Sequence, residues 1–266
     1  MTTPGTLYGI GVGPGAPDLL TLRAHRLINS VDVLAIPRPN EWSKSLAFRI
    51  IEPNLEENEN QEKLFLTFPM SKDPSVVKPY WEKAFEAIGN RLLEGKNVGF
   101  VCQGDPFVFS TFIYLFENAT EKWPEVPIEV VPAVTSISAV PSAAKRPLVD
   151  GMERLAVLPA TYGVDDLKKI IREFDSIVLM KVSSVINQVV EIIEDEGLLE
   201  NSVYVERATS ADEKVVYDLK SLKGNRCVYF SMVVITKKLR SGILATGPSI
   251  LMQNSISHKE TEHAPH

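Results

Sequence analysis

The sequence has few of the residues on which many enzymes depend for catalysis. Only two of its 266 residues are Cys and only four are His. Three of the His residues, His258, His263 and His266, lie within the last nine positions, so His25 is the only one in the body of the chain. A His/Cys metal centre needs several such ligands together, and Ser-His-Asp or Cys-His catalysis needs an imidazole. We therefore expect no metal site and no nucleophile of these kinds.

The chain also lacks long apolar runs and any excess of basic residues. No run reaches the ~18 apolar residues that span a bilayer, and residues 1–5 carry no basic segment followed by an apolar one. Cys102 and Cys227 stand in apolar segments, as reduced buried thiols do. The 28 basic and 34 acidic residues give a net charge of −6, which disfavours nucleic acid as a partner. We expect a cytoplasmic protein that binds neither membrane nor nucleic acid.

Strand-like and helix-like segments alternate along the chain. At roughly 150 residues per domain, the length corresponds to about 1.8 domains. The alternation up to Pro132 predicts an α/β fold with a mainly parallel sheet. Later, strand-like segments at 214–219, 227–230 and 233–236 follow one another closely, which predicts antiparallel pairing and a mixed sheet. We expect two α/β domains, 1–132 and 133–247, and a disordered tail, 248–266.

The first glycine-rich loop follows the first expected strand. Residues 11–16, Gly-Val-Gly-Pro-Gly-Ala, formally fit the dinucleotide pattern G-x-G-x-x-A. Arg38 follows the second strand, where a 2′-phosphate could bind. However, Pro14 and Pro17 lack N–H groups that a pyrophosphate would use, and no Asp or Glu follows the second strand. An NAD(P)-dependent oxidoreductase is therefore the weaker alternative.

Two further loops of small residues, 103–107 and 132–136, also follow expected strands. Ligands bind at the carboxyl ends of parallel strands. Asp105 in the second loop either contacts such a ligand or caps a helix expected over 108–118, with Pro106 at its first position. Together the three loops predict one crevice lined by backbone, suited to a neutral or cationic ligand. None of them supplies an obvious acid, base or nucleophile.

The same segments resemble a known family. Residues 8–15, Tyr-Gly-Ile-Gly-Val-Gly-Pro-Gly, and 20–24, Leu-Thr-Leu-Arg-Ala, are similar to the opening of the tetrapyrrole (class III) S-adenosylmethionine-dependent methyltransferases. Segments 104–106 and 132–136 resemble that family's second and third loops, although the family usually has Gly at Ala133. Within the family, segments 104–111, 153–160, 179–182 and 206–209 resemble the branch that methylates C20 of precorrin-2. The resemblance extends in order to about residue 247.

The resemblance implies a function and a set of contacts. It implies two α/β domains with S-adenosylmethionine in the cleft between them, a homodimer, and a tetrapyrrole in a trough beside the first loop. The implied reaction methylates C20 of precorrin-2 or cobalt-factor II in cobalamin synthesis and leaves S-adenosylhomocysteine. Alternatives are another ring position, a macromolecular substrate or a tetrapyrrole carrier without activity. The implied cofactor contacts are Pro14, Gln103, Gly104, Asp105, Val108, Thr135, Ser136, Met180 and Ala208.

Methyl transfer from a sulfonium also accounts for the scarcity of His and Cys. The cofactor brings the electrophile and the tetrapyrrole carbon is electron-rich, so the protein mainly orients and encloses them. Candidate acceptors for the proton lost afterwards are Asp105, Glu206, Tyr162 and water. A polycarboxylate substrate needs local cations. The candidates are Arg38 and Arg154 first, then Lys181, Lys44 and Arg49.

Overall fold

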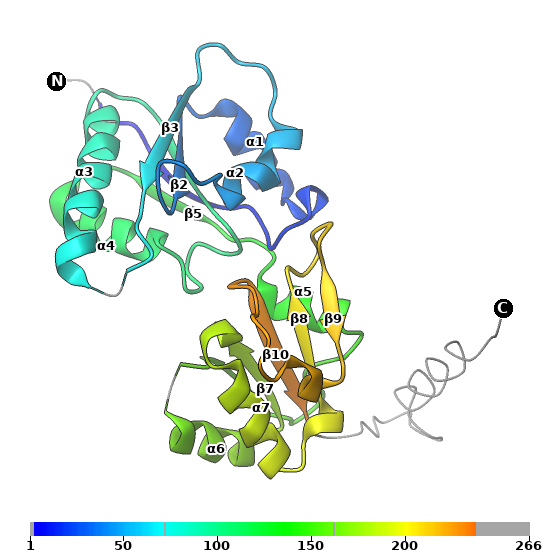
Figure 1. The fold of residues 1–266 in the computed structure, drawn as a ribbon. Helices are drawn as coiled ribbons and strands as arrows, with labels where there is room; N and C mark the ends of the chain where they lie inside the picture. The colour runs from blue at the N-terminus through cyan, green and yellow to red at the C-terminus, as the bar shows by residue number, and fades with distance from the viewer. Residues whose placement is uncertain (1–2, 72, 162, 238–266) are drawn as a thin grey trace. The chain divides into compact units, whose positions relative to one another are not determined.

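The computed structural model describes residues 3–71, 73–161 and 163–237 (Figure 1). The described residues form two compact units that divide between Ser136 and Ile137. The sequence analysis places the boundary at Pro132. The predicted tail, 248–266, and the candidate Tyr162 lie outside the described residues. Within the described ranges, no helix has the length and apolar character needed to cross a membrane.

The first unit contains a five-stranded parallel sheet. Its strand order is β3-β2-β4-β1-β5. Because all the strands run the same way, all the loops that follow them leave from one edge of the sheet. In chain order the elements are β1 (Leu7–Gly11), η1 (Pro17–Leu19), α1 (Leu22–Ser30), β2 (Val33–Arg38), α2 (Leu46–Ile51), η2 (Glu52–Asn54), β3 (Glu62–Thr67), α3 (Pro74–Leu93), β4 (Val98–Cys102), α4 (Phe112–Lys122) and β5 (Ile128–Val131).

Both faces of this sheet are covered by helices. In β2, Val33 and Ala35 pack into one apolar cluster with α3 and α4, whereas Leu34 and Ile36 pack into another with α1 and α2. Figure 1 shows the two helix pairs on opposite sides of the strands. Burial on both faces explains why these strands read as continuous apolar segments rather than alternating ones.

The order of the strands creates a switch point between β1 and β4. From β1 the chain crosses to β2 on one side, whereas from β4 it crosses over β1 to β5 on the other. At such a point the neighbouring loops diverge and leave a crevice outside the carboxyl ends of the strands. The first two loops noted in the sequence follow these two strands.

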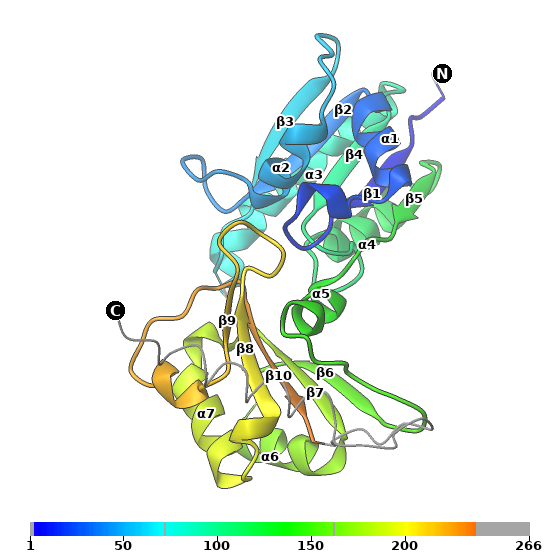
Figure 2. The same cartoon turned by 90° about the vertical axis from the view of Figure 1, so that its right-hand side faces the viewer.

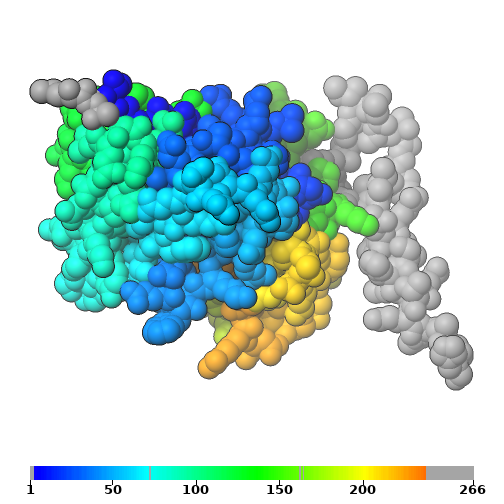
Figure 3. Space-filling model, turned by 90° about the horizontal axis from the view of Figure 1, so that it is seen from above, coloured from blue at the N-terminus to red at the C-terminus, as the bar shows by residue number. Residues whose placement is uncertain are grey.

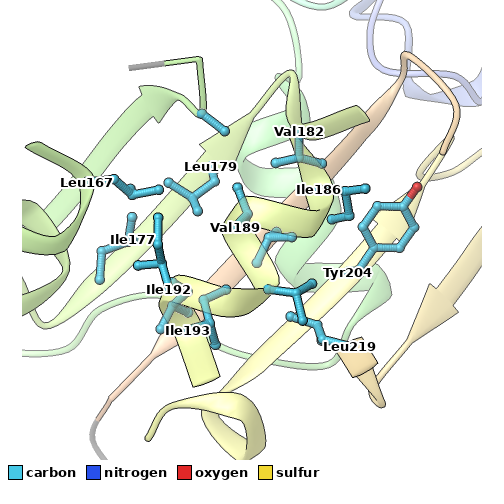
Figure 4. Packing of buried hydrophobic residues seen from close by; sticks show 14 of the residues in the cluster. Leu167, Ile177, Leu179, Val182, Ile186, Val189, Ile192, Ile193, Tyr204 and Leu219 are labelled. Atoms are coloured by element: carbon cyan, nitrogen blue, oxygen red, sulfur yellow. The ribbon is translucent and has the colours of Figure 1, made fainter. Parts of the chain in front are cut away.

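The second unit is built on a mixed sheet of order β6-β7-β10-β8-β9. Strands β6 and β7 are parallel, and β10 pairs antiparallel with β7 and β8. Helices α6 and α7 contribute to the cluster on one face (Figure 4), and α5 packs on the other. The elements are α5 (Ser136–Ala143), β6 (Leu155–Pro159), α6 (Val164–Glu173), β7 (Ser176–Met180), η3 (Val182–Ser184), α7 (Ile186–Asp195), η4 (Leu199–Asn201), β8 (Ser202–Glu206), β9 (Lys214–Val216), η5 (Leu219–Leu222) and β10 (Ser231–Thr236).

The α/β fold class, with a parallel first sheet and a mixed second one, is confirmed. Two local predictions are wrong. Residues 227–230 form no strand, so Cys227 lies half-buried outside the sheet, while Cys102 is buried in β4. Burial raises the pKa of the Cys102 thiol to about 12, which keeps it protonated and unreactive. The helix expected from residue 108 begins at Phe112, because the preceding residues form a turn.

Candidate cofactor site

Hydrogen bonds tie the first loop to the second at the switch point. The Gly104 N–H donates to the Gly13 carbonyl at 2.7 Å, and the Gly13 N–H donates to the Gly104 carbonyl at 3.4 Å. The Gln103 side-chain amide donates to the Pro14 carbonyl at 3.3 Å. Gly13 and Gly104 have φ values of 84° and 71°, which other residues adopt only with strain. The two loops are therefore joined through backbone conformations that favour glycine.

The Asp105 carboxylate joins the second loop to the third. One of its oxygens accepts the Phe107 N–H at 2.9 Å, and the other accepts the Ala133 N–H at 3.0 Å. A further bond, from the Val108 N–H to the Asp105 carbonyl at 3.3 Å, closes a turn. Asp105 therefore does not cap α4, which begins only at Phe112. Its carboxylate acts as a clasp that holds the loops after β4 and β5 together.

Two glycines of these loops have opposite steric surroundings. A Cβ on Gly11 would lie 2.6 Å from the Cβ of Ala133 and 2.8 Å from the Gly104 carbonyl oxygen. A Cβ on Gly104 would have nothing within 4 Å. Gly11 thus allows the three loops to approach closely, whereas the space beside Gly104 is open to a ligand that contacts the backbone.

Ala133 fits the third loop, although the family usually has Gly there. Its N–H reaches Asp105, as described above, and its backbone does not adopt a positive φ. The non-glycine residues with positive φ among those the structure describes are Phe109, Lys145, Lys181, Arg207 and Thr209. An alanine methyl therefore introduces no backbone strain at this position.

The structure brings together the predicted cofactor contacts of the first unit and of the segment joining it to α5. They all lie in the three loops or at the first residue of α5, and they are Pro14, Gln103, Gly104, Asp105, Val108, Thr135 and Ser136. Pro14 is buried, and the others are partly exposed. Their contacts with a ligand remain predictions.

The remaining predicted contacts share one edge of the second sheet. Met180 ends β7 and Ala208 follows β8, and the register of β10 sets Met180 opposite Met232 and Glu206 opposite Ser231. The loops after these two strands contain three of the positive-φ residues named above. Such conformations cost of order 1–3 kcal/mol each and are often found at functional sites.

At this edge, Glu206 is held by a buried phenol that the sequence analysis missed. The Tyr204 hydroxyl donates to Glu206 Oε1 at 2.6 Å, and Tyr204 is fully buried in the cluster of Figure 4. Burial, with hydrogen bonds to Cys227 and Glu206, raises the pKa of Tyr204, so the phenol stays a neutral donor. The sequence did contain a signal for this contact, because Tyr204 and Glu206 are two residues apart on one strand and their side chains therefore share a face.

Among the candidate substrate cations of the first unit, Arg38 is already engaged. Arg38, the last residue of β2, donates from Nη1 to the Glu41 carbonyl at 3.0 Å. Its guanidinium also lies over the Phe65 ring, 5.6 Å from the centroid. Arg38 therefore holds the loop that follows β2.

The candidate cations of the second unit lie at opposite ends of the strands of its sheet. Arg154 precedes β6 and pairs with Glu173 at 3.9 Å and with Asp175 at 4.0 Å, whereas Lys181 follows β7. Because β6 and β7 are parallel, the start of one and the end of the other are far apart. The structure does not bring these two cations together, and their contacts with substrate remain predictions.

The geometry of the first loop departs from that of a dinucleotide-binding protein. There, the pyrophosphate lies at the amino terminus of a helix that starts within the glycine motif. Here both polar backbone groups of Gly13 bond to Gly104, and α1 begins only at Leu22, capped by Thr21. Within the described ranges, no group of three or more His, Cys, Asp or Glu residues could hold a metal ion.

These features define a class of protein: two α/β units, with a ligand site made of backbone loops at a switch point. The sequence profile of the family "Tetrapyrrole (Corrin/Porphyrin) Methylases" matches residues 6–223. The match covers most of the chain, and the protein belongs to that family.

Individual relatives cover most of this chain. It is 34% identical over 236 residues to the cobalt-precorrin-2 C(20)-methyltransferase of Salmonella typhimurium, covering 88% of this chain and 97% of that protein. It is 38% identical over 215 residues to a probable cobalt-precorrin-2 C(20)-methyltransferase of Methanocaldococcus jannaschii, covering 79% and 86%.

Solved structures share the fold. A cobalt precorrin-4 methyltransferase aligns with a TM-score of 0.65 at 25% identity, covering 87% of this chain and 94% of that one. The uroporphyrin-III C-methyl transferase of Thermus thermophilus, complexed with S-adenyl homocysteine, aligns with a TM-score of 0.63 at 21% identity, covering 88% and 98%.

Proposed function

We propose that this protein is an S-adenosylmethionine-dependent C-methyltransferase that methylates C20 of precorrin-2, or of its cobalt-containing form, in cobalamin synthesis. The proposal is carried by the relatives named for this reaction, which are 34% and 38% identical over most of the chain. The loops that carry the resemblance come together at the switch point, as the proposal requires.

The residues of the three loops fit such a cofactor. The space beside Gly104 admits a ligand against open backbone, and the Gly13–Gly104 hydrogen bonds and the Asp105 clasp fix the positions of the three loops. Preformed loops bind a ligand without the cost of ordering them. The cofactor supplies the methyl group, and the chain orients the reactants and excludes water. Met180 and Ala208 remain proposed contacts.

We further propose Glu206 as the acceptor of the C20 proton. Both oxygens of Asp105 already accept backbone N–H groups. Glu206 Oε1 accepts the Tyr204 hydroxyl, and no hydrogen bond to its Oε2 is made within the described part of the chain. Glu206 therefore has a free oxygen on a carboxylate of fixed orientation.

The decisive experiment incubates the purified protein with S-adenosylmethionine and with each of the two substrate forms. We expect a mass gain of one methyl group on at least one of them, located at C20 by NMR. No gain on either form refutes the proposal, and a methyl group on another carbon supports a different ring position. The ratio of the two rates shows whether the enzyme prefers the cobalt form.

Three associated predictions have their own measurements. Thermal shift with S-adenosylhomocysteine and with NADP separates a methyltransferase from an oxidoreductase, because only the true ligand stabilises the folded state. The homodimer implied by the resemblance and the cytoplasmic location expected from the sequence are also part of the proposal. Light scattering should give twice the monomer mass of 29.5 kDa, and cell fractionation should find the protein in the cytosol.

A further inference from the structure

Large apolar side chains of the first unit are exposed along the carboxyl edge of its sheet. They follow different strands, and the most exposed are Leu22 at 84%, Trp42 at 91% and Met70 at 68%, after β1, β2 and β3. Phe107, after β4, is also exposed. Exposed apolar side chains are common singly, but several at one edge mark a binding surface.

Trp42 is exposed on a loop that is itself well fixed. The Asn40 side-chain oxygen accepts the N–H groups of Trp42 at 3.0 Å and of Ser43 at 2.8 Å. Arg38 holds the carbonyl of Glu41, as described above. The segment between β2 and α2 stands out from the first unit in two views (Figures 2 and 3). The indole is thus presented to solvent by an ordered turn, which lowers the entropy lost when a ligand binds.

The indole is accompanied by cations that have no partner among the residues the structure describes. Lys44 is two residues further along, and Arg49 follows on α2. Both are exposed, and neither side chain makes an ion pair or hydrogen bond within the described ranges. A flat aromatic surface beside free cations matches the chemistry of a planar, conjugated ring system that carries carboxylates. The loop leaves the edge from β2, whose sheet neighbour β4 carries the Gly104 loop.

We propose that Trp42 packs its indole on the face of the tetrapyrrole substrate and that Lys44 binds one of the substrate's carboxylates. Arg38 acts through the loop, as a positioning residue for Trp42. The inference rests on the proposed function, because it takes the substrate class from there.

The test compares single variants in the methyl-transfer assay with precorrin-2. Trp42→Ala should raise KM about tenfold, which corresponds to ~1.4 kcal/mol, because stacking on an aromatic side chain contributes roughly 1–3 kcal/mol. Its kcat should stay within about twofold, since the indole binds ground state and transition state alike. Trp42→Phe should restore most of the affinity. Lys44→Met should raise KM about threefold and reduce its salt dependence.

Two controls separate this role from a general effect. Met152→Ala truncates a side chain that is 98% exposed in the second unit, and it should leave KM and kcat unchanged. The affinity of Trp42→Ala for S-adenosylhomocysteine should equal that of the wild type, and calorimetric titration with precorrin-2 should show the same loss of affinity as KM.

Several results would overturn the inference. The stacking role is wrong if the wild type turns over precorrin-2 and Trp42→Ala has a KM within twofold of it. It is also wrong if Trp42→Ala changes the mass in light scattering, because the indole then contacts a second copy. An unchanged KM in Lys44→Met rejects the carboxylate contact. A wild type that neither binds nor methylates precorrin-2 refutes the proposed function, and the inference falls with it.

Discussion

The Asp105 clasp provides the sharpest test of how the site is built. In Asp105→Asn the side chain keeps one acceptor oxygen, and its NH₂ group faces the backbone N–H that the second oxygen had bound. A hydrogen bond to a charged group contributes roughly 1.5–3 kcal/mol. Asp105 is only partly buried, so the lower end applies. We expect the free energy of unfolding to fall by about 1.5 kcal/mol in Asp105→Asn, which loses one of the two hydrogen bonds, and by about 3 kcal/mol in Asp105→Ala, which loses both.

Both variants should still fold, because domains of this size are stable by roughly 5–15 kcal/mol. Asp105→Ala no longer ties the third loop to the second, and Asp105→Asn keeps at most one of the two bonds, so binding S-adenosylhomocysteine must first order the loops. We expect the affinity to fall about fivefold or more, which corresponds to ~1 kcal/mol. Urea unfolding measures the stability, and isothermal calorimetry measures the binding.

The matched control is Glu57→Gln, which removes the same charge from an exposed loop position of the same unit, where the side chain makes no ion pair or hydrogen bond within the described residues. This variant should change neither the stability to urea nor the affinity for S-adenosylhomocysteine. The clasp is the wrong explanation if Asp105→Asn unfolds at the same urea concentration as the wild type and binds S-adenosylhomocysteine equally well. If Glu57→Gln lost as much stability and affinity as Asp105→Asn, the cause would be the change in net charge instead.

The glycines and one ion-pair cluster give further tests. Gly11→Ala should destabilise the protein by about 1–3 kcal/mol, because its Cβ would overlap atoms of both neighbouring loops. Gly104→Ala should cost only about 1 kcal/mol, from its positive φ alone; equal urea midpoints for the two variants would contradict the steric distinction. The Lys220 and Lys223 ammonium groups lower the pKa of Glu194 to about 2. Because the folded-state pKa is depressed, this stabilisation is present above pH 4.5 and is lost as the pH falls towards 2. Glu194→Gln should therefore have a lower urea midpoint than the wild type at pH 7 and the same midpoint near pH 2; a constant difference would refute the ion-pair explanation.

Much of the fold could be predicted because its signals are local. Thr21, for example, caps α1 by accepting the N–H of Ala24, only three residues further along the chain. Continuous apolar segments are typical of strands buried on both faces. The expected strand at 227–230 failed, because its apolar residues include the exposed Tyr229 and Phe230. A short apolar segment does not by itself show whether neighbouring strands are available to pair with it.

The candidate site, like the fold, could be predicted from the sequence only in part. The residue types and spacing of three loops were sufficient for the sequence to indicate a backbone-lined ligand site and a family, and the scarcity of His and Cys pointed to chemistry brought by a cofactor. The role of each charged side chain depended on which groups it bonds to in the folded chain. Asp105 could be a helix cap or a ligand contact until Ala133, 28 residues away, was found bonded to it. Arg38 and Arg154 became engaged side chains through Glu41 and Glu173.

The sequence by itself therefore determined which backbone conformations and strands are available, because glycine, proline and apolar patterning act within a few residues. Only the tertiary structure decided which polar groups bond to one another and which stay free. A hydrogen bond depends on distance and direction, and these follow from the order of the strands in the sheet. The clasp at Asp105, the buried donor at Tyr204 and the exposed indole at Trp42 are all outcomes of that packing.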